Sequence, residues 1–569
     1  MLKQWVISGM IIFQCAFSSI ASAGASGVPI ICYHDVGGTV SNDYTITKEN
    51  LKNHLAYLKA NGYHPISLQQ YMAFTKEGAS LPDKPVMLTF DDGYISFYND
   101  VFPLLKEYNY PAMLAIVGSW LEYSPPDVGK TVNWQQLREM DASGLVTMAS
   151  HSFRSHHWTT INSQDDRGEM LSSRIYSNGH YETTEEFKLR VNDDLKQSQQ
   201  EFEKELGHKV LAVVWPYGEY NLIDIEIAQS VGIESTFGLG GGINLTGNKG
   251  LVEARRGIIE GNPSTAVFAS FLKNGGLDNK PMKATYLDID AIYVPNSLRE
   301  TDNNLTLAIA KFNKNGTNTV FLQTVSDQKK TGKPPEAFFH TTVIPVQADI
   351  FSHIASKLRN GGFAVYAVMP SLSSPWLDPV DQVVATEQNG KSGRVTSFSP
   401  VVQKKLIDLY TDLGSYAYAD GVLFQDDLSV SGSQDMQAFT VQLMKAVHTY
   451  RPYTLFARSI SPESVLGKNG NYQSYVDAYD YTIIMANSVI SQQNSNVAEL
   501  GNLAQTALAQ SDASRKVVFM LNTFDPDKNV WISDKELRGK IDALRSKGAV
   551  NFTYYPENTL EDKVAKAAL

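Results

Sequence analysis

A short apolar run that ends in two adjacent carboxylates is the feature that most constrains how this chain folds. The run Val86–Phe90 leads directly into Asp91, Asp92 and Gly93. A buried strand with this ending carries both charges to the carboxyl edge of a sheet, where α/β folds place their chemistry. Two carboxylates this close repel each other in a cleft, and a divalent cation removes that cost. The pattern predicts an α/β domain in which one Asp binds a metal ion and the other remains free as a base.

Three other blocks accompany this motif. Tyr33-His34-Asp35 lies upstream, and the stretches 150–157 (SHSFRSHH) and 215–218 (WPYG) lie downstream. Asp-Asp-Gly alone is equally typical of a surface turn. Histidines within 150–157 can complete a metal site, which makes the turn interpretation the weaker one.

These blocks, in this order, resemble the polysaccharide deacetylase (carbohydrate esterase) family. The stretches 31–36 (ICYHDV), 213–219 (VVWPYGE) and 421–427 (GVLFQDD) are similar to one two-domain branch, the periplasmic poly-β-1,6-N-acetylglucosamine N-deacetylases of the PgaB type. The resemblance covers nearly the whole mature chain. It implies a metal-dependent, irregular (β/α) barrel that removes acetyl groups from N-acetylglucosamine polymers.

The length of 569 residues predicts two domains. Apolar runs at 29–33, 86–90, 112–117, 144–149 and 210–215 predict strands in the first half, and helical spacing predicts helices at 47–61 and 98–108. The polar stretch 159–184 is either a capping loop or a mobile insertion.

Eight strand-like runs follow Lys280, with helices predicted at 349–359, 401–418, 436–450 and 534–547. This pattern predicts a (β/α)8 TIM-type barrel over 280–569, after a deacetylase domain over 24–275. The eight runs are 284–293, 319–325, 363–369, 421–424, 454–457, 481–485, 517–521 and 550–554.

The N-terminus has the pattern of a signal peptide. Lys3 precedes the apolar run 6–17, and Ala21-Ser22-Ala23 forms a cleavage site, so we expect residues 1–23 to be removed. Cys15 raises lipid anchoring as an alternative, although residues 12–14 lack the small side chains that usually precede a lipidated Cys. Cys32 is then the only cysteine, and its apolar neighbours predict a buried thiol on a strand.

A net charge of −11 argues against nucleic acid as a partner and suits a cationic glycan. The resemblance implies a periplasmic location, with possible association with the outer membrane. It also implies three partners: poly-β-1,6-N-acetylglucosamine, its deacetylated form and an outer-membrane export porin.

For the first domain, we expect Asp92, His151 and His156 to hold one divalent ion (zinc, nickel, cobalt or iron), with His157 as a rival third ligand. Asp91 would be the general base. The resemblance further implies that the backbone N–H of Tyr217 stabilises the oxyanion and that Trp215 and Tyr217 contact substrate.

Two departures from the wider family stand out. Val214 occupies the position of the Arg that commonly holds the base Asp, and no histidine lies between His208 and His340 to act as the usual general acid. His34 is the best substitute acid, although it is also explained as a core histidine bonded to Asp35 or backbone. The departures imply a weak deacetylase that modifies only part of its polymer.

For the second domain, Asp426 and Asp427 follow the fourth predicted strand, and Asp426 is favoured as catalytic. Asp288 and Asp290 are expected at the end of the first strand, on one face. With Trp376 and Tyr481 as aromatic platforms, these carboxylates predict a sugar groove with acid/base capacity. A cleft that only binds glycan remains the alternative for this domain.

Two other functions remain open for the whole chain. A chitin or peptidoglycan deacetylase is compatible with the first domain, but the fused second domain argues against it. A non-catalytic polysaccharide-export chaperone has no need of the set Asp91, Asp92, His151 and His156.

Overall fold

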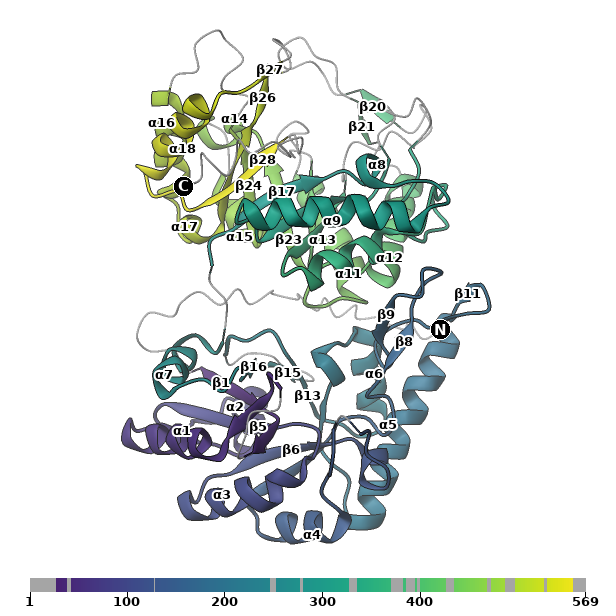
Figure 1. Cartoon of the computed structure of the whole chain (residues 1–569), viewed down its shortest axis with the longest axis vertical. Helices are drawn as coiled ribbons and strands as arrows, with labels where there is room; N and C mark the ends of the chain where they lie inside the picture. The colour runs from purple at the N-terminus through teal and green to yellow at the C-terminus, as the bar shows by residue number, and fades with distance from the viewer. Residues whose placement is uncertain are drawn as a thin grey trace, which may run out of the picture. The chain divides into compact units, whose positions relative to one another are not determined.

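Figure 1 shows the computed structural model of the chain, coloured from purple at the N-terminus to yellow at the C-terminus. The structure describes residues 27–37, 42–126, 128–245, 252–276, 280–326, 335–369, 382–384, 394–396, 400–425, 434–467, 472–486, 497–525 and 530–555. The chain forms two compact units. One comprises Met1–His151, Phe202–Val214 and Glu234–Leu277, and the other comprises Ser152–Glu201, Trp215–Ile233 and Asp278–Leu569. Within the described ranges, no helix is both long and apolar enough to cross a membrane.

The first sheet has ten strands in the order β14-β1-β5-β6-β7-β12-β13-β15, with β16 beside β1 and β4 beside β5. The β1–β14 pair is antiparallel and the other pairs are parallel. β15 ends the order at one side, whereas β16, which begins two residues later, pairs with β1, so the sheet nearly closes into a barrel. The strands are β1 (Val28–Tyr33), β4 (His64–Pro65), β5 (Pro85–Phe90), β6 (Ala112–Ile116), β7 (Val146–Ser150), β12 (Ala212–Val214), β13 (Ser235–Gly238), β14 (Ile243–Asn244), β15 (Val252–Arg255) and β16 (Gly257–Ile258).

The central strands are buried along their whole length. Every residue of β1, β5 and β6 is buried, because parallel strands covered on both faces have no solvent side. This is why they appear in the sequence as continuous apolar runs, and all five strands predicted for this half are confirmed.

The helices of this part begin at recognisable caps. The Thr47 hydroxyl accepts the Asn50 N–H at the start of α1, and Ser67 with Gln70 forms a capping box at α2. The predicted helix 98–108 is a π-helical turn over Phe97–Val101 followed by α3. The helices are α1 (Lys48–Ala60), α2 (Leu68–Glu77), α3 (Phe102–Tyr108), α4 (Trp134–Ala142), α5 (Thr184–Leu206), α6 (Leu222–Ser230) and α7 (Thr265–Asn274).

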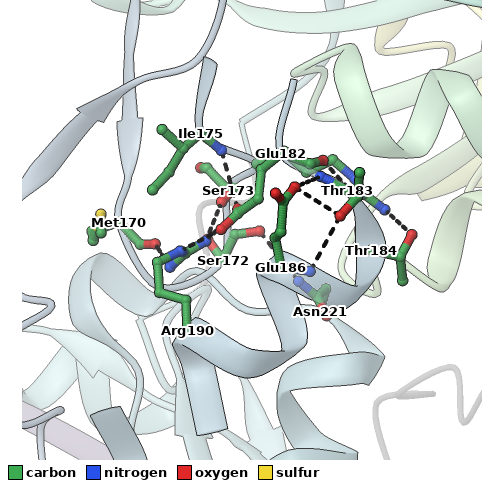
Figure 2. A network of polar contacts seen from close by, with 11 residues as sticks. Met170, Ser172, Ser173, Ile175, Glu182, Thr183, Thr184, Glu186, Arg190 and Asn221 are labelled. Atoms are coloured by element: carbon green, nitrogen blue, oxygen red, sulfur yellow. Dashed lines mark hydrogen bonds and ion pairs between the residues drawn. The ribbon is translucent and has the colours of Figure 1, made fainter. Parts of the chain in front are cut away.

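The polar stretch before α5 has structure of its own. It contains two antiparallel ribbons, β8 (Trp158–Thr160) with β9 (Arg167–Glu169) and β10 (Tyr176–Ser177) with β11 (His180–Tyr181). Figure 2 shows Arg190 of α5 holding this segment. The Arg190 Nε and Nη2 atoms each donate to Glu182 over 2.8 Å, Nη2 also donates to the Ser173 carbonyl over 2.9 Å, and Nη1 donates to the Met170 carbonyl. Four bonds from one guanidinium therefore fasten the segment to α5.

The second sheet is a closed barrel of eight parallel strands. All eight predicted strands are present, which confirms the TIM-type fold. A cluster of apolar side chains that includes Tyr286, Phe321 and Tyr366 fills the barrel, and a larger apolar layer separates its strands from the outer helices. The strands are β17 (Lys283–Leu287), β18 (Thr319–Gln323), β19 (Ala364–Met369), β22 (Gly421–Phe424), β23 (Leu455–Ile460), β24 (Tyr481–Met485), β25 (Val517–Asn522) and β28 (Asn551–Tyr555).

Helices surround this barrel, and the four helices predicted for it are confirmed within a few residues at each end. The helices are α8 (Ile289–Ile292), α9 (Leu298–Lys314), α11 (Phe351–Asn360), α12 (Pro400–Tyr416), α13 (Gln434–His448), α14 (Pro462–Leu466), α15 (Tyr472–Ala478), α16 (Val497–Leu508), α17 (Ala513–Lys516) and α18 (Asp534–Arg545).

Two predictions about the barrel are wrong. The first strand ends at Leu287, so Asp288 stands at the N-cap position of the short helix α8, without a side-chain capping bond, and Asp290 lies within that helix. Strand alternation therefore does not place them on one face. Tyr481, expected as an aromatic platform for sugar, begins β24, and its ring packs with the barrel interior. A side chain at the amino end of a barrel strand lies away from the carboxyl edge where barrel enzymes bind substrate.

Candidate metal centre and active site

Five parallel strands of the first sheet deliver polar side chains to the same edge. His34 follows β1, Asp91 and Asp92 follow β5, His151 follows β7, and Arg256 follows β15. The fifth strand, β12, leads into the Trp-Pro-Tyr-Gly turn. Because parallel strands share one carboxyl edge, residues spread over more than two hundred positions meet there.

Asp91 is held by a buried arginine that the sequence did not point to. The Arg256 Nη1 atom donates to Asp91 Oδ1 over 2.7 Å, and Nη2 donates to Oδ2 over 2.9 Å. Asp91 is 3% exposed and Arg256 is 1% exposed. Burial alone would raise the pKa of Asp91, but the guanidinium charge more than offsets this, so that pKa lies well below its ordinary value. The carboxylate is thus ionised and fixed in orientation by a bidentate pair.

The departure at Val214 is compensated elsewhere in the sheet. Val214 occupies the position in sequence where the wider family has its arginine, and Arg256, which directly follows β15, supplies the guanidinium to Asp91 instead. Arg256 also donates to the Thr89 hydroxyl over 3.2 Å and to the Gly238 carbonyl over 3.1 Å. All three guanidinium nitrogens thus have partners, which is what a buried arginine requires.

Three residues other than glycine, each just after a strand of this site, adopt left-handed backbone conformations. Asp92 has φ 71°, Ser152 has φ 72° and Tyr217 has φ 58°. Such conformations cost roughly 1 kcal/mol or more for residues with a Cβ, and they gather at functional sites. Gly93 also has positive φ, and a Cβ there would lie 2.9 Å from the Ile116 side chain, so the turn after Asp92 requires glycine.

Asp92, His151 and His156 form a group that fits a divalent metal ion. Their ligand atoms all lie within 4.8 Å of one another. The His151 Nδ1 atom lies 2.7 Å from the Val214 carbonyl, to which it donates, and this leaves Nε2 facing Asp92 Oδ1 at 3.4 Å. A metal-binding histidine is commonly oriented in this way, by a hydrogen bond from its other nitrogen. Two imidazoles and one carboxylate match the donor set of catalytic zinc and related ions, and leave positions for water and substrate.

His157 is oriented differently from His156. The side chain of His157 is exposed, and its Nδ1 lies 3.0 Å from the Arg154 carbonyl. The three-residue group includes His156 and does not include His157. The geometry therefore favours His156 as the third ligand.

His34 lies beside the base. One ring nitrogen of His34, the Cys32 thiol and an Asp91 oxygen lie within 4.8 Å of one another. Asp35 accepts hydrogen bonds from Ser96 (2.8 Å) and Thr45 (3.3 Å), and among the described residues the buried Nδ1 of His34 has no hydrogen-bond partner. These contacts leave His34 available to the site instead of bonded to Asp35.

Cys32 is a buried thiol on β1, as the sequence predicts. Its Sγ atom lies 3.4 Å from Asp91 Oδ2, to which the S–H donates, a contact that the sequence did not predict. Burial is the main reason that the pKa of this thiol lies well above its ordinary value. The thiol therefore remains protonated and acts as a weak donor to the base.

The aromatic residues near the metal group differ in exposure. Trp215 is fully buried and stacks on Tyr220, whereas Trp158 of β8 is 44% exposed. The Tyr217 ring lies 4.6 Å from the His156 ring and 4.6 Å from the Trp158 ring. Trp158 was not predicted as a site residue. The only signal for it in the sequence is its position directly after His156 and His157.

The barrel residues are only partly described. Asp290 is paired with Gln323, the last residue of β18. The Asp290 backbone N–H donates to Gln323 Oε1 over 3.0 Å, and Gln323 Nε2 donates to the Asp290 carboxylate over 2.8 Å. Asp288 directly follows the last residue of β17, at the carboxyl edge of the barrel. Asp426, Asp427, Trp376 and the predicted signal peptide lie outside the described residues.

Comparisons with known proteins found matches in both halves of the chain. A family model for polysaccharide deacetylases matches residues 78–236, and a model for hypothetical glycosyl hydrolase family 13 matches residues 286–438 and 429–555. The poly-β-1,6-N-acetyl-D-glucosamine N-deacetylase of Escherichia coli (strain K12) is 30% identical over 95% of this chain and 90% of its own length. The chain belongs to the poly-β-1,6-N-acetyl-D-glucosamine N-deacetylase family. It is a polysaccharide deacetylase with a glycoside hydrolase-like domain, and the resemblance seen in its motifs is confirmed.

Two solved structures are similar to parts of this N-deacetylase family member. A de-N-acetylase from Aggregatibacter actinomycetemcomitans is 32% identical, with a TM-score of 0.40, and the match covers 43% of this chain and 100% of that one. The PgaB (BpsB) glycoside hydrolase domain from Bordetella bronchiseptica is 22% identical, with a TM-score of 0.44, and the match covers 51% of this chain and 98% of that one.

Proposed function

We propose that the protein hydrolyses the N-acetyl groups of poly-β-1,6-N-acetylglucosamine, and that its barrel binds and cleaves the partly deacetylated polymer. The observation that carries the first activity is Asp91, clamped by Arg256, immediately before the metal-binding group of Asp92, His151 and His156. A binding protein has no need of an ionised, oriented carboxylate beside such a group. This argues against a non-catalytic export chaperone.

Asp92, His151 and His156 would hold the metal ion, which when bound supplies Lewis acidity toward the acetamide carbonyl. Asp91 accepts the proton of the attacking water, while Arg256 keeps its carboxylate in place. The backbone N–H of Tyr217 donates to the developing oxyanion. His34 donates a proton to the amine as the C–N bond breaks, and the exposed Trp158 ring packs against a sugar ring.

The remaining assignments rest on the sequence. We propose that residues 1–23 are a signal peptide, that 24–275 and 280–569 are the two domains, and that the protein acts in the periplasm with an outer-membrane export porin as partner. Deacetylation exposes amines that are protonated near neutral pH. Acidic residues of the barrel, namely Asp426 as the catalytic acid together with Asp427 and Asp288, then attract the product.

The direct test is to incubate the whole protein with β-1,6-linked N-acetylglucosamine oligomers and to measure acetate release and chain length. We expect acetate release that a chelator abolishes, followed by shortening of the partly deacetylated chains. In Asp426→Asn, acetate release should persist while shortening stops, because the two reactions use different carboxylates. Shortening that persists in Asp426→Asn but stops in Asp427→Asn would reverse that assignment. Acetate release from chitin oligomers alone would favour the chitin deacetylase alternative.

A second prediction concerns His34. We expect His34→Ala to lower the rate of acetate release by about 10²–10⁴-fold, because it removes the donor to the leaving amine. Metal content should not change, since His34 is not in the group of Asp92, His151 and His156. His64→Ala removes an exposed histidine as a control and should leave the rate unchanged. A wild-type rate in His34→Ala would refute the assignment.

A further inference from the structure

Helix α5 holds the loop that connects the two histidine ligands. This loop runs from His151, at the end of β7, to His156. Asp194 of α5 accepts the Phe153 N–H over 2.8 Å, the Arg154 N–H over 3.0 Å and the Ser155 hydroxyl over 2.7 Å. Three consecutive loop residues thus converge on one carboxylate. Asp194 itself is 2% exposed.

From these contacts, we infer that Asp194 is a positioning residue for the metal centre, which sets the place of His156. The inference rests on the proposed metal group. Asp194 acts through Phe153, Arg154 and Ser155, three of the loop residues that lie between His151 and His156.

The geometry explains why a carboxylate is needed at this position. His151 and His156 are five residues apart, so a regular helix would turn them to different faces. The loop instead takes a left-handed turn at Ser152, whose hydroxyl accepts the Ser155 N–H over 3.2 Å. A tight turn of this kind leaves successive N–H groups pointing the same way with no strand or helix partner. The Asp194 carboxylate satisfies two of them with charge-assisted bonds, which are stronger than neutral ones.

The same helix fastens the chain on the other side of His156. Arg190 lies one helical turn before Asp194. Its guanidinium donates to the carbonyls of Met170 and Ser173 and to the carboxylate of Glu182 (Figure 2). α5 therefore binds the chain both before and after His156. The residues that Asp194 binds are nearer to His156 in sequence than those that Arg190 binds. Removing the outer support of a metal ligand typically lowers metal affinity by about 10–100-fold.

The test is to measure Zn²⁺ and Co²⁺ affinity of the whole protein, without substrate, after Asp194→Asn. We expect the metal dissociation constant to rise by about 10–100-fold, because the amide nitrogen faces N–H donors and the charge is lost. The visible spectrum of bound Co²⁺ should also change, since it reports ligand geometry. Asp193→Asn is the control: Asp193 is the neighbouring residue, is exposed, and should leave both readouts unchanged.

A purely structural role would give a different result. Asp194→Asn would then lower thermal stability but leave the dissociation constant and the Co²⁺ spectrum of the folded protein as in the wild type, and this would overturn the inference. If Asp194→Asn does not fold, Ser155→Ala removes one of the three bonds and should raise the dissociation constant by a smaller factor; unchanged affinity there would refute the inference as well. Wild-type protein that binds no metal would instead refute the proposed function.

Discussion

Asp91→Asn is expected to abolish acetate release while the protein keeps its metal ion. The amide accepts no proton, so the general base is lost, which lowers the rate by about 10²–10⁴-fold. The amide oxygen still accepts a bond from Arg256, although loss of the Asp91 charge should lower the free energy of unfolding, as in any broken buried ion pair. Asp91 is not among the three predicted ligands, and metal content should therefore equal that of the wild type.

His151→Ala provides the contrast, because it removes a ligand and should lower metal content and acetate release together. The measurements are acetate release and the metal content of each purified protein. Asp91→Asn that loses its metal ion would mean that Asp91 is a ligand. Asp91→Asn with the wild-type rate would assign the base to another residue.

Arg256→Met is expected to destabilise the fold and to stop acetate release. It leaves the Asp91 carboxylate buried beside the Cys32 thiol without its positive partner. Breaking one side of a buried ion pair typically lowers the free energy of unfolding by about 3–5 kcal/mol. Denaturant unfolding of the metal-free protein measures this directly, without the charge of a bound ion.

A double variant separates charge from packing. Asp91→Leu with Arg256→Met removes both charges, and we expect it to recover most of the lost stability but none of the activity, because apolar replacement of a buried pair is often neutral. Arg255→Met is the control, since Arg255 is adjacent and exposed, and it should leave stability and activity unchanged. Wild-type stability in Arg256→Met would show that the pair contributes nothing to the fold.

The barrel shows how much of the fold could be predicted from the sequence. All eight of its strands appear as apolar runs separated by helical patterns, because parallel strands buried on both faces admit few polar residues. The error at Asp288 and Asp290 arose where the chain leaves the strand. A four-residue helix has too few positions to show a helical period, so the run 284–293 reads as one strand.

The ligand and base assignments came from the resemblance of Asp91, Asp92, His151 and His156 to a known motif order. The rule that parallel strands end at one edge of a sheet predicted that these side chains meet there. Neither the resemblance nor this rule indicates Arg256. It lies 165 residues after Asp91, in a stretch with no motif, and only the order of strands in the sheet brings it to the base.

The sequence by itself determined the strands of both sheets and most of the helices named in advance, because burial and local backbone preference are written in short-range patterns. The tertiary structure alone decided which side chains support the site. Arg256 clamps Asp91 and Asp194 holds the histidine loop through contacts that span 165 and about 40 residues of sequence. Such contacts depend on which strands and helices become neighbours when the sheet nearly closes. A single sequence carries no local pattern from which that order can be read.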